Sequence, residues 1–166
     1  MNKSLSALFA EDRYPHSAAI ALGNGQSLRV QYRAASKTQE AAVKDFLKEK
    51  FAALGFDPDV ALRSLSGHLP DGEDLAAFES AFEALGETAS EQIVGVAVLS
   101  RGFGLAQIIG SWSLLEGKAR HELDEAVCAE SCAALPDDVK RTLEALAASA
   151  QAPAEALDFF GQSPRS

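Results

Sequence analysis

The fold class of this chain is decided by residues 92–116, QIVGVAVLSRGFGLAQIIGSWSLLE. Two apolar runs flank a short Gly-rich segment at 101–104, and the second run alternates, with Ile108, Trp112 and Leu114 on one side and serines on the other. Alternation with a period of two predicts a half-buried strand, and two such runs around a Gly-rich loop predict a β-hairpin. We therefore expect a hairpin here, with residues 101–104 at its tip.

A second hairpin is predicted nearer the amino terminus. Short apolar runs at 18–22 and 28–33 flank Gly23-Asn24-Gly25-Gln26, and Asn-Gly in this position is a strong hairpin signal. The two hairpins together predict an antiparallel sheet of about four strands. One sheet face is expected to be polar, and to be either solvated or covered by a partner; its residues are Arg29, Gln31, Arg33, Gln107, Ser111 and Ser113.

Several amphipathic helices are expected to pack against this sheet. Ser36 and Gln39 have the spacing of a capping box, and Asp57-Pro58 has the pattern of an N-cap followed by a first helical residue. Apolar periodicity and Gly or Pro stops predict helices over 36–54, 57–66, 71–86, 118–134 and from 136 onward. The sequence therefore predicts a single α+β domain over residues 1–160, followed by a disordered tail at 161–166.

The composition favours a globular protein with an acidic surface. The chain has 166 residues, of which 47 per cent are hydrophobic, so it can build a core without disulfides or a metal ion. The 24 Asp and Glu residues outnumber the 15 Lys and Arg residues and give a net charge of −9. The parts before and after residue 90 share this excess almost equally, so the acidity is not held in a tail.

These features argue against two classes of partner. Nucleic-acid binding needs clustered Lys and Arg, and the densest basic patch, Lys44 to Lys50, is interrupted by Asp45 and Glu49. No apolar run reaches membrane-spanning length without interruption, and the first apolar run is too short for a signal-peptide core. We expect a cytoplasmic protein that binds neither nucleic acid nor membrane.

The strongest candidate for a metal site or a reactive thiol is a set of four residues on the helix predicted at 118–134. His121, Glu125, Cys128 and Cys132 follow one another at spacings that place them along one helical stripe. Such a stripe can ligate a metal, or it can hold a nucleophilic or redox thiol. The alternative is that both cysteines are small core residues. The chain has only these two cysteines, which argues against a disulfide framework.

Three further features are candidates for partner or ligand binding. Arg101 and Phe103, at the predicted hairpin tip, can grip a carboxylate or phosphate, or can belong to an ordinary turn. Arg101 and Trp112 can also gate a pocket between sheet and helices. Phe159 and Phe160 can dock onto another protein, or can fold back to cap the core.

The residues contain no complete catalytic constellation, so we expect no catalytic residue and no cofactor. The function we predict is that of a non-catalytic protein-binding module, such as a small acidic chaperone, adaptor or accessory factor, that forms a homodimer. An acidic surface suits a basic partner. Two alternatives remain: a small metal- or thiol-dependent enzyme using Cys128 and Cys132, and a small-molecule-binding protein.

Overall fold

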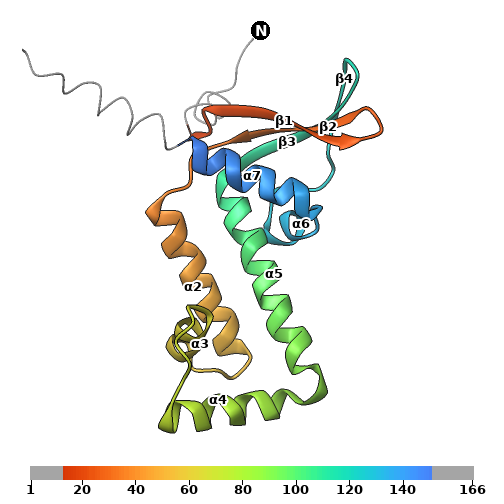
Figure 1. The fold of residues 1–166 in the computed structure, drawn as a ribbon. Coiled ribbons are helices and arrows are strands. Elements are labelled where there is room, and N and C mark those ends of the chain that lie inside the picture. Colours follow the sequence, from red (N-terminus) through yellow and green to blue (C-terminus); the bar gives the residue numbers. More distant parts are fainter. Residues whose placement is uncertain (1–12, 151–166) are drawn as a thin grey trace, which may run out of the picture.

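The computed structural model describes residues 13–150, which contain one antiparallel sheet and a set of helices (Figure 1). The sheet has four strands in the order β1-β2-β3-β4, and each strand is antiparallel to its neighbours. The fold class predicted from the sequence is therefore confirmed. The strands are β1 (His16–Gly23), β2 (Gln26–Tyr32), β3 (Ile109–Glu116) and β4 (Ala119–Glu122).

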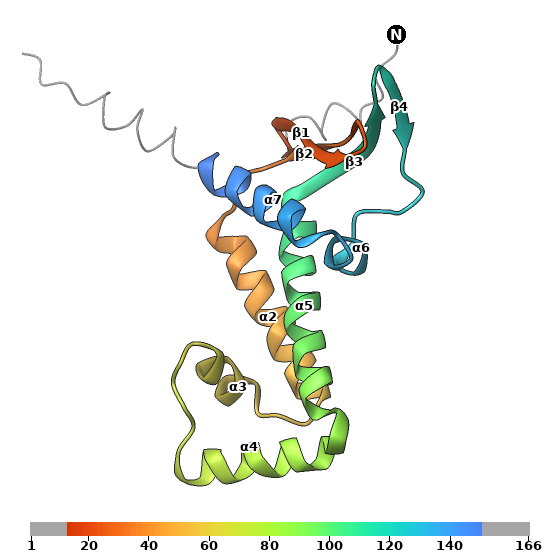
Figure 2. The same ribbon diagram turned by 45° about the vertical axis from the view of Figure 1, so that its right-hand side comes forward.

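Between β2 and β3 the chain leaves the sheet and builds a long helical projection. We call residues 37–108 the arm, and the sheet with the helices after it the base. In the arm, α2 leads away from the sheet, α4 crosses the far end and α5 returns (Figures 1 and 2). The arm comprises α2 (Lys37–Ala53), α3 (Pro58–Leu65), α4 (Gly72–Leu85), the 3₁₀ turn η1 (Gly86–Thr88) and α5 (Ala89–Ile108), and the base adds α6 (Ala129–Ala133) and α7 (Asp137–Ser149).

Several local predictions are confirmed. The first hairpin turns at Asn24 and Gly25, both of which have positive φ, as an Asn-Gly turn requires. The capping box at the start of α2 is present, because the amide of Gln39 donates to Ser36 Oγ at 3.3 Å and the amide of Ser36 donates to Gln39 Oε1 at 3.0 Å. Asp57 caps α3 by accepting two backbone amide hydrogen bonds.

The hairpin predicted at 92–116 is wrong, because most of that stretch is helical. α5 continues to Ile108, and only the part from Ile109 onward is a strand. The two glycines that suggested a turn lie inside α5, and Gly102 serves close packing: a Cβ there would lie 2.2 Å from the carbonyl oxygen of Ala129 in α6. The second hairpin is instead formed by β3 and β4, with Gly117 at positive φ in its turn.

The helix predicted at 118–134 is also wrong. Residues 119–122 form the short edge strand β4, residues 123–128 are an irregular connection, and only Ala129–Ala133 is helical as α6. A 3.6-residue stripe was present in the sequence, but β4 pairs with β3 through His121 and Arg120 among others. Pairing with an existing strand outweighed a weak local helical preference.

The apolar side chains gather in two separate clusters. The base cluster joins Leu28 and Val30 of β2 to Leu143 of α7 and to Leu105 near the end of α5. The arm cluster lies at the far end of the arm and comprises Phe51, Phe56, Ala61 and Val96, with Leu47, Leu54, Phe78, Ala81, Leu85 and Ile93 packed against them. α5 has apolar residues on more than one face because it contributes to both clusters with different faces.

Candidate functional site

The four residues predicted to share a helical stripe lie on three different parts of the base. His121 is in β4, Glu125 is in the connection that follows, Cys128 is the N-cap of α6 and Cys132 lies within α6. The stripe itself therefore does not exist. Among residues 13–150, no group of three or more His, Cys, Asp or Glu side chains is placed to hold a metal ion.

The two thiols have opposite environments. The side chain of Cys132 is fully buried in the base cluster, and this burial, with a smaller contribution from Cys128, raises the pKa of the thiol to about 11. Cys132 is therefore a neutral thiol at physiological pH and a poor nucleophile. Cys128 is exposed, but its sulfur accepts the amide hydrogen bond of Ser131 at 3.5 Å and so caps α6.

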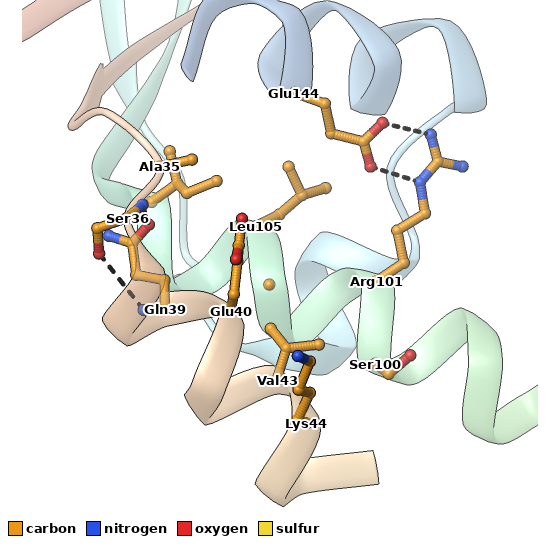
Figure 3. A pocket seen from close by; sticks show the side chains of 12 residues that line it. Ala35, Ser36, Gln39, Glu40, Val43, Lys44, Ser100, Arg101, Leu105 and Glu144 are labelled. Atoms are coloured by element: carbon orange, nitrogen blue, oxygen red, sulfur yellow. Dashed lines mark hydrogen bonds and ion pairs between the residues drawn. The ribbon is translucent and has the colours of Figure 1, made fainter. Parts of the chain in front are cut away.

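Arg101 projects from α5 to α7 and not from a hairpin tip. Its Nε and Nη2 donate to the carboxylate of Glu144 at 2.6 and 2.9 Å (Figure 3). Its Nη1 donates to Asp137. These partners raise the pKa of Arg101, and the hydrogen bond from Arg101 lowers the pKa of Asp137. A bidentate guanidinium–carboxylate pair has a well-defined geometry. Arg101 thus fastens the arm to the base.

Phe103 also has a structural partner. Its ring stacks on Phe46 of α2, with centroids 4.3 Å apart and planes inclined by 11°. The contact joins the two long helices of the arm, and both rings are half-buried. Phe103 therefore packs α5 against α2, whereas the sequence placed it at the tip of a hairpin.

Trp112 lies on the inner face of the sheet, opposite Val30, and is mostly buried. Its indole N–H donates to the carbonyl oxygen of Glu125 at 2.8 Å, which fixes the connection before α6. Trp112 lines a cavity of about 600 Å³ together with Leu28, Leu123, Cys128 and Leu135. Arg101 does not line this cavity but lines another one, so the two side chains proposed to gate one pocket contribute to different cavities.

A second cavity, of about 430 Å³, lies where the arm joins the base (Figure 3). α2, α5 and α7 surround it. Its walls are apolar and its rim carries charges of both signs. The wall residues include Ala35, Val43, Gly104, Leu105 and Ile108, and the rim residues are Glu40, Lys44, Arg101 and Glu144. Sequence reasoning missed this cavity, because its walls meet only after α2 and α5 have packed.

The outer face of the sheet is polar, as predicted, but its membership differs. Arg29 and Gln31 of β2 lie opposite Ser113 and Ser111 of β3, and Ser111 Oγ donates to Gln31 Oε1 at 3.0 Å. Gln107 belongs to α5 and not to the sheet, which corrects the prediction. Its carbonyl oxygen accepts a hydrogen bond from Arg33 Nε at 2.8 Å, which ties the end of β2 to α5.

The arm carries most of the large apolar side chains that are exposed. Six of the seven within residues 13–150 belong to it: Leu65, Leu69, Leu75, Phe82, Val94 and Val98. Leu69, between α3 and α4, is 86 per cent exposed, and Val94 on α5 is 60 per cent exposed. Single exposed apolar residues are ordinary, so the feature that sets the arm apart is the number of them that it carries.

Phe159 and Phe160 lie outside the described residues, as does the tail at 161–166. Comparison of the chain with protein-family models, with curated proteins and with solved structures gave no match. No helix between residues 13 and 150 combines the length and the hydropathy needed to cross a bilayer.

Proposed function

We propose that this protein is a non-catalytic protein-binding module, and that its arm carries the binding surface. The observation that supports this proposal is the placement of six exposed large apolar side chains on the arm, against one, Leu22, on the base. Exposing apolar surface to water costs about 25 cal/mol per Å². A partner that covers these side chains recovers that free energy.

α5 gives the most specific support. Val94, Val98, Arg101 and Leu105 have the spacing of one helical stripe. Toward the base this stripe is covered, since Leu105 is buried in the base cluster and Arg101 pairs with α7. Toward the far end the same stripe continues uncovered at Val94 and Val98. A partner element lying beside α6 and α7 would extend packing that already exists.

The partner in this proposal is another protein or a second copy of the chain. The predicted homodimer is the case in which Val94 and Val98 of two copies pack against each other. The proposed absence of nucleic-acid and membrane partners rests on the acidic composition and the lack of a basic cluster. The proposed cytoplasmic location rests on the short or interrupted apolar runs of the sequence.

The test is site-specific photo-crosslinking of the full-length protein in its native cells. A photoreactive residue replaces Val98 on the arm or, as the matched control, the exposed Ala148 on α7. We expect discrete crosslinked products from position 98 and none from position 148. A product at twice the chain mass identifies the homodimer, and other masses identify a different partner. Equal products from both positions, or none from position 98, would refute the proposal.

The cavity where the arm joins the base supports a second candidate function, the binding of a small apolar molecule. Its volume of about 430 Å³, its apolar walls and its few polar groups are typical of ligand sites. Native mass spectrometry of protein purified from its own source tests this function. We expect a bound mass that denaturation releases and that Val43→Phe, which fills the cavity, removes. An unliganded chain in the wild-type protein would contradict this second function.

A further inference from the structure

α4 is the most weakly covered long helix of the arm. None of its residues is buried. Its apolar stripe is Leu75, Phe78, Phe82 and Leu85, of which Phe78 packs against Phe56 with ring centroids 4.9 Å apart. Phe82 and Leu75 stay on the outer edge of this stripe, and each is 39 per cent exposed. α4 therefore packs with one edge of its apolar face and presents the other edge to solvent.

An open hollow of about 380 Å³, which we call the groove, lies at this exposed edge. It is lined by Phe78 and Phe82 and by Glu79 and Glu83, all from α4. The two rings form an apolar floor and the two carboxylates form a charged rim. This arrangement suits a partner that presents apolar side chains with cations beside them.

The charge around the groove has one sign. Residues 71–91 contain seven Asp and Glu residues and no Lys or Arg. Among residues 13–150, ion pairs reach only one of the seven, Asp74, which binds Arg63 at 3.0 Å. Glu83 also lies near the carboxyl end of α4, where the helix dipole disfavours a negative charge. Nothing within the described chain balances these rim carboxylates.

We propose that the groove on α4 binds a basic amphipathic helix of another protein. The partner's apolar side chains would rest on Phe78 and Phe82, and its Lys or Arg side chains would pair with Glu79 and Glu83. An apolar groove flanked by charge is a common way to seat a helix. This inference rests on the proposed function, and it adds the site and the chemical class of the partner.

A second copy of this chain fits the groove less well. The most basic helix of the described part is α2, with Lys37, Lys44, Lys48 and Lys50. Lys48 is already paired with Asp59 at 2.8 Å, and Lys50 lies over the ring of Phe46. α2 also uses its apolar side chains Leu47 and Phe51 in the arm cluster. Two of its four lysines and these apolar residues are thus engaged within the chain.

The test measures binding of synthetic peptides to the full-length protein by fluorescence anisotropy. The probe is a Leu/Lys peptide of about 18 residues, patterned so that Leu forms one helical face. One control peptide has the same composition in an order that gives no apolar face, and another replaces Lys by Glu. We expect the first peptide to bind at least about tenfold more tightly than either control, and to lose affinity as salt rises.

Variants of the protein locate the binding. Glu79→Gln with Glu83→Gln, and separately Phe82→Ser, should each weaken binding of the amphipathic Leu/Lys peptide about tenfold. Asp124→Asn with Asp138→Asn removes the same charge from exposed positions of the base and should leave the affinity within about twofold. Because all these side chains are exposed or half-exposed, circular dichroism should show the wild-type fold in each variant.

Equal weakening by the base variant would mean non-specific attraction to an acidic protein and would overturn the inference. Unchanged binding in both groove variants would overturn it as well. If the wild-type chain is a dimer and the groove variants are monomers, a second copy occupies the groove and the inference is wrong. Crosslinks from position 98 that persist in any of these cases leave the proposed function standing, so the two failures are distinguishable.

Discussion

The base and the arm contain similar numbers of apolar residues but bury them to different extents. In the base, the inner sheet face, α7 and the end of α5 enclose one cluster, in which Val30, Leu143 and Cys132 are almost inaccessible to water. In the arm, the cluster around Phe51 and Phe56 is small, and α4 adds no buried residue to it. The comparison indicates that the base supplies stability while the arm displays apolar surface.

Truncation of one leucine in each region tests this difference most directly. Leu143→Ala removes a side chain that is 1 per cent exposed and should lower the free energy of unfolding by about 2–5 kcal/mol. Leu75→Ala, on the exposed edge of α4, should change it by about 0.5 kcal/mol or less. Urea unfolding followed by circular dichroism measures both. Similar losses for the two variants would show that the arm is as tightly packed as the base.

A pair of glycines on α5 tests the same difference along one helix. Gly102→Ala should destabilise the protein by about 1–3 kcal/mol, because the new Cβ meets the backbone of α6. Gly95→Ala should stabilise it by up to about 1 kcal/mol, because no neighbouring atom lies within 4 Å and alanine favours the helix. Thermal unfolding of both variants measures the contrast. A stabilising Gly102→Ala would contradict the close approach of α6.

Arg101 joins the two regions, and its contribution should depend on pH. The hydrogen bond from Arg101 lowers the pKa of Asp137 in the folded state. The stabilisation linked to this shift is fully present above the unfolded-state pKa of about 4 and is lost as the pH falls through the lowered folded-state value. Arg101→Gln should therefore flatten the acid limb of the stability–pH curve. Chemical denaturation at a series of pH values measures this, and an unchanged acid limb would argue against the pairing.

The smallest expected effect concerns the two thiols of the base. Cys128 should react with a thiol reagent in the native protein, whereas Cys132 should react only after unfolding, because burial raises its pKa to about 11. Titration with and without denaturant, followed by mass spectrometry, counts the modified sites. Cys128→Ser gives the control, which should show no reaction under native conditions. Rapid native reaction of Cys132 would reopen the thiol-enzyme alternative.

The elements that could be predicted from the sequence are those with local signals. The Asn24-Gly25 turn, the Ser36–Gln39 capping box and the Asp57 cap each depend on neighbouring residues, and each is present. The helix predicted over 71–86 is likewise present as α4, because one of its faces stays in water and its apolar residues therefore recur with helical spacing. Local chemistry was sufficient where tertiary packing did not override it.

The predictions that were wrong concern segments whose structure depends on tertiary packing. α5 has apolar residues on several faces because it contributes to two clusters, so they do not form the single narrow stripe that would mark the segment as a helix. Gly102 is a residue type typical of turns, although in the structure it allows α6 to approach. The pairing of Arg101 with Glu144 joins residues far apart in sequence, which no spacing rule reveals. The net negative charge is shared almost equally by the parts of the chain before and after residue 90. This even division gave no sign of the acidic segment 71–91, which distinguishes α4 from the other helices.

The position of the arm within the sheet has a consequence for how the protein folds. β2 and β3 are hydrogen-bonded neighbours, with Tyr32 opposite Ile109, yet the whole arm separates them along the chain. Antiparallel neighbours are usually joined by a short turn, whose closure costs little chain entropy. Packing of α2 against α5 brings the ends of β2 and β3 together and so shortens the loop that their pairing must close. We therefore expect the helices of the arm to form before the central pairing of the sheet, and that pairing to be the slow step of folding.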